Sequence, residues 1–223
     1  MFARIARRYD LMNRLMTAGQ DHRWRQEVIR RVALPTGGRL LDIGAGTGDL
    51  AREALRQYPD CHPVAADFTL EMMRVGKNRV TLSRLGWSAA DALCLPFLSG
   101  VFDAVISGFL LRNVSDIQGA LREQHRVLAP GGSIVVLDTT RPPHNLLSPM
   151  INFHLHTVIP ALGQVVTGSR EAYTYLPETT GSFLEAEKLA AQMVQAGFRE
   201  VGFRRLMFGT IAIHWGKKMR DEV

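Results

Sequence analysis

Short aliphatic runs alternate with longer amphipathic stretches along most of the chain. Runs of this length bounded by turn residues are typical of buried strands, and the stretches between them have the spacing of helices. This order predicts a parallel α/β sheet. Its strands are expected at residues 39–43, 63–66, 87–90, 102–107 and 133–138, of which the third has the weakest pattern.

Two more strands are expected near the C-terminus, at residues 200–207 and 210–216. Only Phe208 and Gly209 separate them. Since a parallel crossover needs about a dozen residues, these two strands must pair antiparallel. The sequence therefore predicts an otherwise parallel sheet that is closed by an antiparallel hairpin.

Three segments outside these strands complete the predicted organisation. Residues 1–35 are expected to form an N-terminal helical flap that stops at the Pro and Gly residues of the next turn. A last helix is expected at residues 183–196, because Gly197 follows in the usual C-terminal position. Residues 141–182, interrupted by prolines and rich in aromatic, His and aliphatic side chains, are expected to form an insertion, a lid over an acceptor site. No internal repeat is visible, so residues 1–223 are predicted to form a single domain.

The composition is that of a globular protein, with 46% hydrophobic and 22% charged residues. No stretch approaches the roughly 20 apolar residues that span a bilayer, and no apolar signal core follows the basic N-terminus. The two cysteines, Cys61 and Cys94, are too far apart in the sequence for metal-ligand spacing and are expected to be free thiols. These features predict a cytoplasmic protein without a metal ion.

The formal net charge of +6 favours acidic partners. Several basic residues gather in the N-terminal helices, among them Arg23, Arg25, Arg30 and Arg31. One interpretation is an ordinary solvated face; the other is a peripheral contact with anionic headgroups at the inner face of the cell membrane. No nucleic acid partner is expected, because the chain lacks an aromatic strand platform and a dense basic run. A homodimer stays open as an alternative to a monomer.

The stretch "RLLDIGAGTGDL" at residues 39–50 places a glycine-rich turn directly after a predicted strand. Gly44, Gly46 and Gly48 allow the backbone to approach a ligand closely. The third glycine comes one residue too early for the dinucleotide motif G-x-G-x-x-G. Asp42 and Asp49 put carboxylates where a phosphate would bind, so the turn favours a cationic ligand.

Polar groups at two later strand ends narrow the ligand further. Asp67 stands 19 residues beyond Gly48, where its carboxylate can accept hydrogen bonds from both hydroxyls of a ribose. Asp91 and Ala92 end the next strand and can contact an adenine ring, with Asp91 accepting from the exocyclic amine. A ribose without a pyrophosphate indicates S-adenosylmethionine. The alternative is that the glycines only form a tight turn and Asp67 only caps the following helix.

Motifs over almost the whole chain resemble the ubiquinone/menaquinone biosynthesis C-methyltransferases. They are "FARIARRYDLMNRLMTAGQDHRWR", "LLDIGAGTGDL", "FLLRNVSD", "ALREQHRVLAPGG", "VIPALG" and "AYTYL". The resemblance implies the class I S-adenosylmethionine-dependent methyltransferase fold: a Rossmann-like, seven-stranded, mostly parallel sheet with an antiparallel C-terminal strand and helices on both faces. It also implies S-adenosylhomocysteine as the product and the cofactor contacts Thr47, Asp67, Asp91, Ala92 and Ser107.

The chain departs from the family pattern in two places. Leu110 replaces a glycine of the family's "FGLRN" block, and residues 177–189 replace a stretch that often contains His-Pro. Leu110 is expected to narrow the acceptor pocket. Both departures bear on the identity of the substrate more than on the chemistry.

The resemblance implies methylation of a ring carbon of a polyprenyl quinol, with demethylmenaquinol as the favoured acceptor. Only the reduced ring is nucleophilic at that carbon. Arg112 can stabilise the developing phenolate and Asn113 can hold a water or the quinol oxygen. Tyr9 would complete this set from the flap. The alternatives are a surface turn for Arg112 and Asn113 and ordinary helix packing for Tyr9.

Apolar and aromatic residues are expected to hold the lipophilic quinol. The expected substrate contacts are Phe109, Leu110, Phe153, His154 and Tyr173, with plain core packing as the alternative. His154 and its neighbouring histidines lack metal-ligand spacing. Two other functions stay open: methylation of carbon, oxygen or nitrogen on another small aromatic or lipid acceptor, and binding of S-adenosylmethionine without catalysis.

Overall fold

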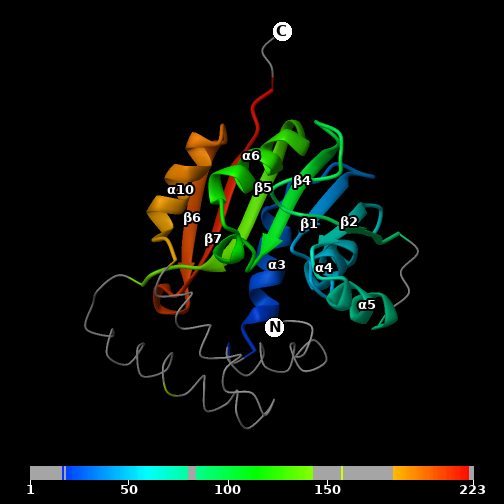
Figure 1. The fold of residues 1–223 in the computed structure, drawn as a ribbon, viewed down its shortest axis with the longest axis horizontal. Coiled ribbons are helices and arrows are strands. Elements are labelled where there is room, and N and C mark those ends of the chain that lie inside the picture. Colours follow the sequence, from blue (N-terminus) through cyan, green and yellow to red (C-terminus); the bar gives the residue numbers. More distant parts are fainter. Residues whose placement is uncertain (1–16, 18, 80–83, 143–156, 158–182, 221–223) are drawn as a thin grey trace.

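The computed structural model describes residues 17, 19–79, 84–142, 157 and 183–220, which form a seven-stranded sheet in the order β3-β2-β1-β4-β5-β7-β6 (Figure 1). The strands are β1 (Arg39–Ile43), β2 (His62–Asp67), β3 (Gly86–Ala89), β4 (Phe102–Gly108), β5 (Leu128–Thr139), β6 (Arg199–Leu206) and β7 (Ile211–Lys217). The first five are mutually parallel, whereas β7 lies antiparallel between β5 and β6. This confirms the predicted sheet and its antiparallel C-terminal hairpin.

Helices pack on both faces of the sheet, as expected. They are α3 (Asp21–Arg31), α4 (Asp49–Gln57), α5 (Leu70–Arg79), α6 (Ile117–Val127) and α10 (Ala186–Gln195), with the short 3-10 helices η1 (Leu111–Asn113) and η3 (Met207–Gly209). None of the helices within the described ranges has the length and hydropathy needed to cross a bilayer.

Strand β5 shows why the sheet needs two helical layers. Its side chains alternate between the faces. Ile134 and Val136 are buried in one core cluster with residues of α6 and α10. Val135 and Leu137 are buried in a second cluster with residues of α3 and α4. Because both faces of a central strand are apolar, neither face can be left to solvent.

Most predicted boundaries agree with the structure to within a few residues, and β1 has the predicted limits. The largest difference is β5, which begins at Leu128 instead of residue 133. Leu128 pairs with Phe102 and Ser133 with Ala104, so the intervening Pro and Gly residues form an irregularity inside the strand. In the sequence these residues have the composition of a loop. The last helix begins at Ala186, three residues later than expected.

The predicted flap and lid lie largely outside the described residues. Of residues 1–35, the structure describes residues 17 and 19–35, which include α3, and of residues 141–182 it describes Arg141, Pro142 and Thr157. The single-domain organisation with these two accessory segments therefore stays a prediction.

The parallel strands all end at one edge of the sheet, which we call the carboxyl edge. Strand β7 begins at the same edge, because its Ile211 pairs with Thr139 at the end of β5. The connections reverse direction across the sheet between β1 and β4, which are neighbours there. In open α/β sheets the crevice outside the strand ends at such a reversal is the usual place for a ligand.

Candidate functional site

A cavity of about 470 Å³ opens at the carboxyl edge beside β1 and β4. Of the residues predicted to bind the cofactor, it is lined by Asp42, Gly44, Gly46, Thr47, Asp67, Asp91 and Ala92. Gly48 and Ser107 lie outside this lining. The Ser107 side chain is fully buried, and its hydroxyl has no hydrogen-bond partner within the described part of the chain.

The lining groups follow the order of the strands. Asp91 comes after β3, Asp67 ends β2, the glycine turn follows β1, and Phe109 follows β4. These four strands are neighbours in the sheet. With strands about 4.8 Å apart, the groups span roughly 14 Å along the carboxyl edge. The cavity therefore suits an extended ligand that lies across the strand ends.

The glycines of the turn are required by its geometry. Gly44 and Gly48 have φ values of 67° and 80°, in the left-handed region that favours glycine. A Cβ on Gly44 would lie 2.9 Å from Cδ1 of Leu110, and one on Gly48 would lie 2.8 Å from Cη2 of Trp87. The turn thus packs tightly against Leu110 and Trp87, and Gly46 lies in the cavity lining.

Asp67 joins this turn to the end of β2. Its Oδ2 accepts a hydrogen bond from the Gly46 N–H at 2.7 Å, and its Oδ1 accepts from the Thr69 N–H at 2.6 Å. The second bond closes a turn just before α5, because Thr69 precedes Leu70, the first residue of that helix. It does not compete with ligand binding, because each carboxylate oxygen can accept more than one hydrogen bond. Two fixed oxygens at the cavity wall suit a pair of ribose hydroxyls.

Asp42 lies beneath the turn and is almost fully buried. Its Oδ2 accepts from the Ala51 N–H at 3.1 Å, whereas Oδ1 has no hydrogen-bond partner among the described residues. Burial raises the pKa of this carboxyl from 3.8 to about 8, with a smaller contribution from the nearby charges of Asp67 and Asp49. An orphaned acidic oxygen at the cavity fits a cationic ligand group, such as the sulfonium or ammonium of S-adenosylmethionine.

Asp49 is less available to a ligand than the sequence suggested. It forms ion pairs with Arg52 on its own helix and with Arg25 on α3. Its negative charge is therefore already compensated in the protein. Arg25 itself lines the cavity. The sequence did not indicate this position, because Arg25 belongs to a group of basic residues that was interpreted as a surface. Phe68 and Met72 are further lining residues that no motif had indicated.

The predicted acceptor side of the cavity is built on an unusual backbone. Phe109 has a φ of 58°, a value that non-glycine residues with bulky side chains rarely adopt. Its N–H donates to the Leu137 carbonyl at 2.7 Å, and its carbonyl accepts from Nδ2 of Asn113 at 2.9 Å. Phe109, Leu110 and Asn113 all line the cavity. The strained turn therefore holds two apolar side chains and one amide at the end of β4.

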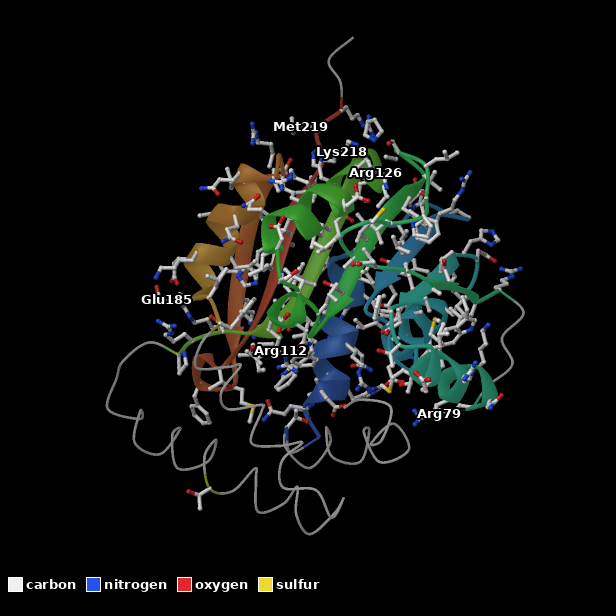
Figure 2. The ribbon with its side chains drawn as sticks, in the orientation of Figure 1. Arg79, Arg112, Arg126, Glu185, Lys218 and Met219 are labelled. Atoms are coloured by element: carbon white, nitrogen blue, oxygen red, sulfur yellow. The ribbon has the colours of Figure 1, made fainter. Side chains whose placement is uncertain are left out.

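Arg112 lies behind this wall, outside the lining of the cavity. Its side chain is only 7% exposed, so the surface-turn alternative is wrong for this residue. Nε lies 3.9 Å from Oδ1 of the fully buried Asp138, and the Arg112 backbone N–H donates to Oδ2 at 3.3 Å. Nε and one terminal nitrogen have no hydrogen-bond partner in the described ranges. Figure 2 shows Arg112 at the carboxyl edge, opposite the end of the sheet at which Arg126 and Lys218 lie.

Asp138 ends β5 next to this guanidinium. Burial raises the pKa of Asp138, while Arg112 and the backbone N–H of Thr139 act against that rise. Asp138 therefore holds the Arg112 guanidinium in a buried position close to the acceptor side.

The remaining predicted site residues lie outside the described residues. They are Tyr9, Phe153, His154 and Tyr173. Within the described ranges, no group of three or more His, Cys, Asp or Glu side chains could hold a metal ion.

The strand order and the cavity at the reversal define a class I methyltransferase fold. A chain of the Haloferax volcanii complex between the Trm112 methyltransferase activator and a methyltransferase aligns over 99% of this chain and 98% of that chain, with a TM-score of 0.71 and 16% identity. Phosphoethanolamine N-methyltransferase 2 of Haemonchus contortus, solved in complex with S-adenosyl-L-methionine, aligns over 89% of this chain and 53% of that chain, with a TM-score of 0.68 and 16% identity. These likenesses establish the fold.

The chain belongs to the ubiE/COQ5 methyltransferase family, whose model matches residues 1–218. The ubiquinone/menaquinone biosynthesis C-methyltransferase UbiE of Desulfotalea psychrophila is 44% identical over 98% of this chain and 89% of that protein. The demethylmenaquinone methyltransferase of Thermus thermophilus is 41% identical over 98% of this chain and 100% of that protein. Membership confirms the predicted enzyme class, a methyltransferase that uses S-adenosylmethionine.

Proposed function

We propose that the protein transfers the methyl group of S-adenosylmethionine to a ring carbon of a polyprenyl quinol, with demethylmenaquinol as the favoured acceptor. The observation that carries this proposal is the distribution of charged and apolar side chains along the cavity at the carboxyl edge. The carboxylates of Asp67 and Asp91 line the end next to β2 and β3. Among the described residues, the end next to β4 has no carboxylate and is lined mainly by apolar side chains, with the polar groups of Asn113 and Ser115. The relatives named for quinone methylation support the same acceptor.

The chemistry needs orientation more than a covalent nucleophile. When bound, S-adenosylmethionine supplies an electrophilic methyl group on a positively charged sulfur. The protein must hold the acceptor carbon in line with that methyl, and such positioning is worth up to roughly 7–11 kcal/mol. The acceptor must be reduced, because a quinol ring gains electron density as its hydroxyl loses a proton, whereas the oxidised quinone is itself electrophilic.

Asn113 is assigned to the quinol oxygen as a direct contact, and Arg112 as a charge behind it. Asn113 lines the cavity, and its side chain is oriented by the Phe109 carbonyl. Its amide can hold the quinol hydroxyl or a water beside it. Arg112 lies buried behind the same turn, where its fixed positive charge stabilises negative charge that develops on the oxygen. A water at this wall accepts the ring proton that restores aromaticity.

We also propose that the enzyme is a cytoplasmic protein that contacts the inner face of the membrane with its carboxyl edge. A prenylated substrate resides in the bilayer, so the cavity must open toward it. Phe68 follows β2 and is 80% exposed, and Phe208 lies in the turn between β6 and β7 and is 63% exposed. Both belong to the carboxyl edge. The net charge of +6 favours anionic headgroups.

The membrane contact is tested by sedimentation with vesicles. Anionic vesicles are expected to bind the protein more than neutral vesicles, and Phe68→Ser with Phe208→Ser is expected to weaken that binding. Equal sedimentation of the wild type and the double variant would contradict a contact through this edge.

The acceptor is tested by transfer of a labelled methyl group into extractable lipid. Demethylmenaquinol and the corresponding ubiquinone-pathway quinol are each supplied in the reduced and oxidised forms. Label is expected only with a reduced acceptor, and more with demethylmenaquinol. Label in neither quinol, from a protein that binds S-adenosylmethionine, would reject the quinol and favour another small aromatic or lipid acceptor.

A further inference from the structure

The charges that line the cavity are unequal in number. Its acidic side chains are Asp42, Asp49, Asp67 and Asp91. Arg25 is the one cationic side chain among the described residues of the lining. S-adenosylmethionine carries a sulfonium, an ammonium and a carboxylate, so the ligand has one anionic group, which the carboxylates of Asp67 and Asp91 would repel. That group needs a cationic partner.

Arg25 is held in place by carboxylates on two helices. On α3, its terminal nitrogen Nη2 lies 3.0 Å from Oδ2 of Asp21, one turn earlier. Across to the first residue of α4, the same nitrogen lies 3.3 Å from Oδ2 of Asp49. The Arg25 side chain is 20% exposed. Asp21 is itself fixed, because it forms hydrogen bonds with Thr17.

This arrangement leaves the guanidinium suited to a further anion. A guanidinium has five N–H donors in a planar fork, and both ion pairs described above engage Nη2. A fork of this kind matches the two oxygens of a carboxylate better than a lysine ammonium does. Two protein carboxylates orient the fork, and a third carboxylate can be supplied by a ligand.

The position of Arg25 matches the amino-acid end of the ligand. With adenine at Asp91 and ribose at Asp67, the remaining part of the ligand continues past β2 over the glycine turn that follows β1. Thr47, Asp49 and Arg25 line the cavity where that turn enters α4. Asp42 lies beneath the same turn. The one described cation of the wall is therefore at the end of the cavity where the carboxylate must lie.

We propose that Arg25 binds the carboxylate of the methionine moiety of S-adenosylmethionine, positioned for this by Asp21 and Asp49. Helix α3 would thereby contribute directly to cofactor binding and close the cavity over the glycine turn. The proposal deepens the proposed function, because it rests on S-adenosylmethionine as the methyl donor.

The test compares ligands with and without the carboxylate. Dissociation constants are measured by calorimetry for S-adenosylmethionine, for decarboxylated S-adenosylmethionine, and for 5′-methylthioadenosine, which lacks the whole amino-acid part. Wild-type protein is compared with Arg25→Gln and Arg25→Lys. Arg52→Gln is the matched control, because Arg52 also pairs with Asp49 but does not line the cavity.

Arg25→Gln should weaken the binding of S-adenosylmethionine about 10- to 100-fold, because a charge-assisted hydrogen bond is lost. The dissociation constants of decarboxylated S-adenosylmethionine and 5′-methylthioadenosine should change less than about twofold. For S-adenosylmethionine, the dissociation constant of Arg25→Lys should fall between those of Arg25→Gln and the wild type. For the other two ligands, no such difference is expected. Arg52→Gln should bind all three ligands as the wild type does.

Two results would overturn the proposal. If Arg25→Gln weakens all three ligands equally while its thermal unfolding stays cooperative, Arg25 only supports the turn. If it leaves S-adenosylmethionine unchanged, another group binds the carboxylate. Failure of the wild type to bind either S-adenosylmethionine or 5′-methylthioadenosine is a different result, since it would reject the cofactor assignment itself.

Discussion

Replacement of Asp42 by Asn should stabilise the free enzyme and weaken its binding of the cofactor. Burial raises the pKa of Asp42 from 3.8 to about 8. The unfolded chain therefore loses this proton at a lower pH than the folded chain does, and stability falls between these two values as pH rises. At about 1.36 kcal/mol per unit, the cost to the folded state at pH 7 is about 4 kcal/mol.

The Asn side chain removes that cost but introduces another. An amide can still accept from the Ala51 N–H, yet its own N–H groups would face the place where Oδ1 has no described partner. An unsatisfied buried donor costs about 1–3 kcal/mol. The net gain at pH 7 to 8 is therefore about 1–3 kcal/mol, which corresponds to a rise in melting temperature of several degrees for a chain of this length.

Thermal unfolding of the ligand-free proteins at pH 5 and pH 8 measures this effect. The wild type should lose about 4 kcal/mol of stability between these pH values through this one group, and Asp42→Asn should lack that part of the pH dependence. Calorimetry should show weaker binding of S-adenosylmethionine by the variant, since the cationic ligand loses its carboxylate. An identical pH dependence in the two proteins would refute the raised pKa of Asp42.

Three further substitutions test other parts of the site. Gly48→Ala should lower the free energy of unfolding, measured in urea titrations, by about 1–3 kcal/mol, because φ is 80° and the new Cβ would lie 2.8 Å from Trp87. An unchanged unfolding midpoint would contradict this packing. Asp67→Asn should weaken the binding of S-adenosylhomocysteine and of 5′-methylthioadenosine to the same extent in calorimetry, since both carry the ribose. Weaker binding of only one of them would argue against the ribose contact. Arg112→Lys should lower kcat about tenfold or more, while the dissociation constant of S-adenosylhomocysteine changes less than about twofold. Weaker cofactor binding at unchanged kcat would exclude a role of Arg112 in acceptor chemistry.

The sequence predicted those parts of the site that depend on strand ends. Because parallel strands end at one edge, Asp67 and Asp91 could be placed beside the glycine turn from the chain order alone. Their positions in the cavity lining agree with that reasoning. The antiparallel hairpin followed in the same way from the two residues between its strands.

The parts that the sequence did not predict depend on tertiary contacts. Arg25 reaches the cavity because α3 packs beside α4, and nothing in its local pattern distinguishes it from a solvated basic residue. Arg112 was expected to face the substrate, yet it lies against Asp138, 26 residues further along the chain. The left-handed backbone at Phe109 also has no sequence signal, since no glycine or asparagine marks it.

The orientation of the cofactor along the carboxyl edge is the central claim, and a crystal structure of the complex with S-adenosylhomocysteine measures it directly. Adenine is expected beside Asp91, the ribose hydroxyls within hydrogen-bond distance of Asp67, and the sulfur over the glycine turn, facing Phe109 and Asn113. Adenine at the β4 end, or a cofactor bound away from the glycine turn, would contradict this account of the site.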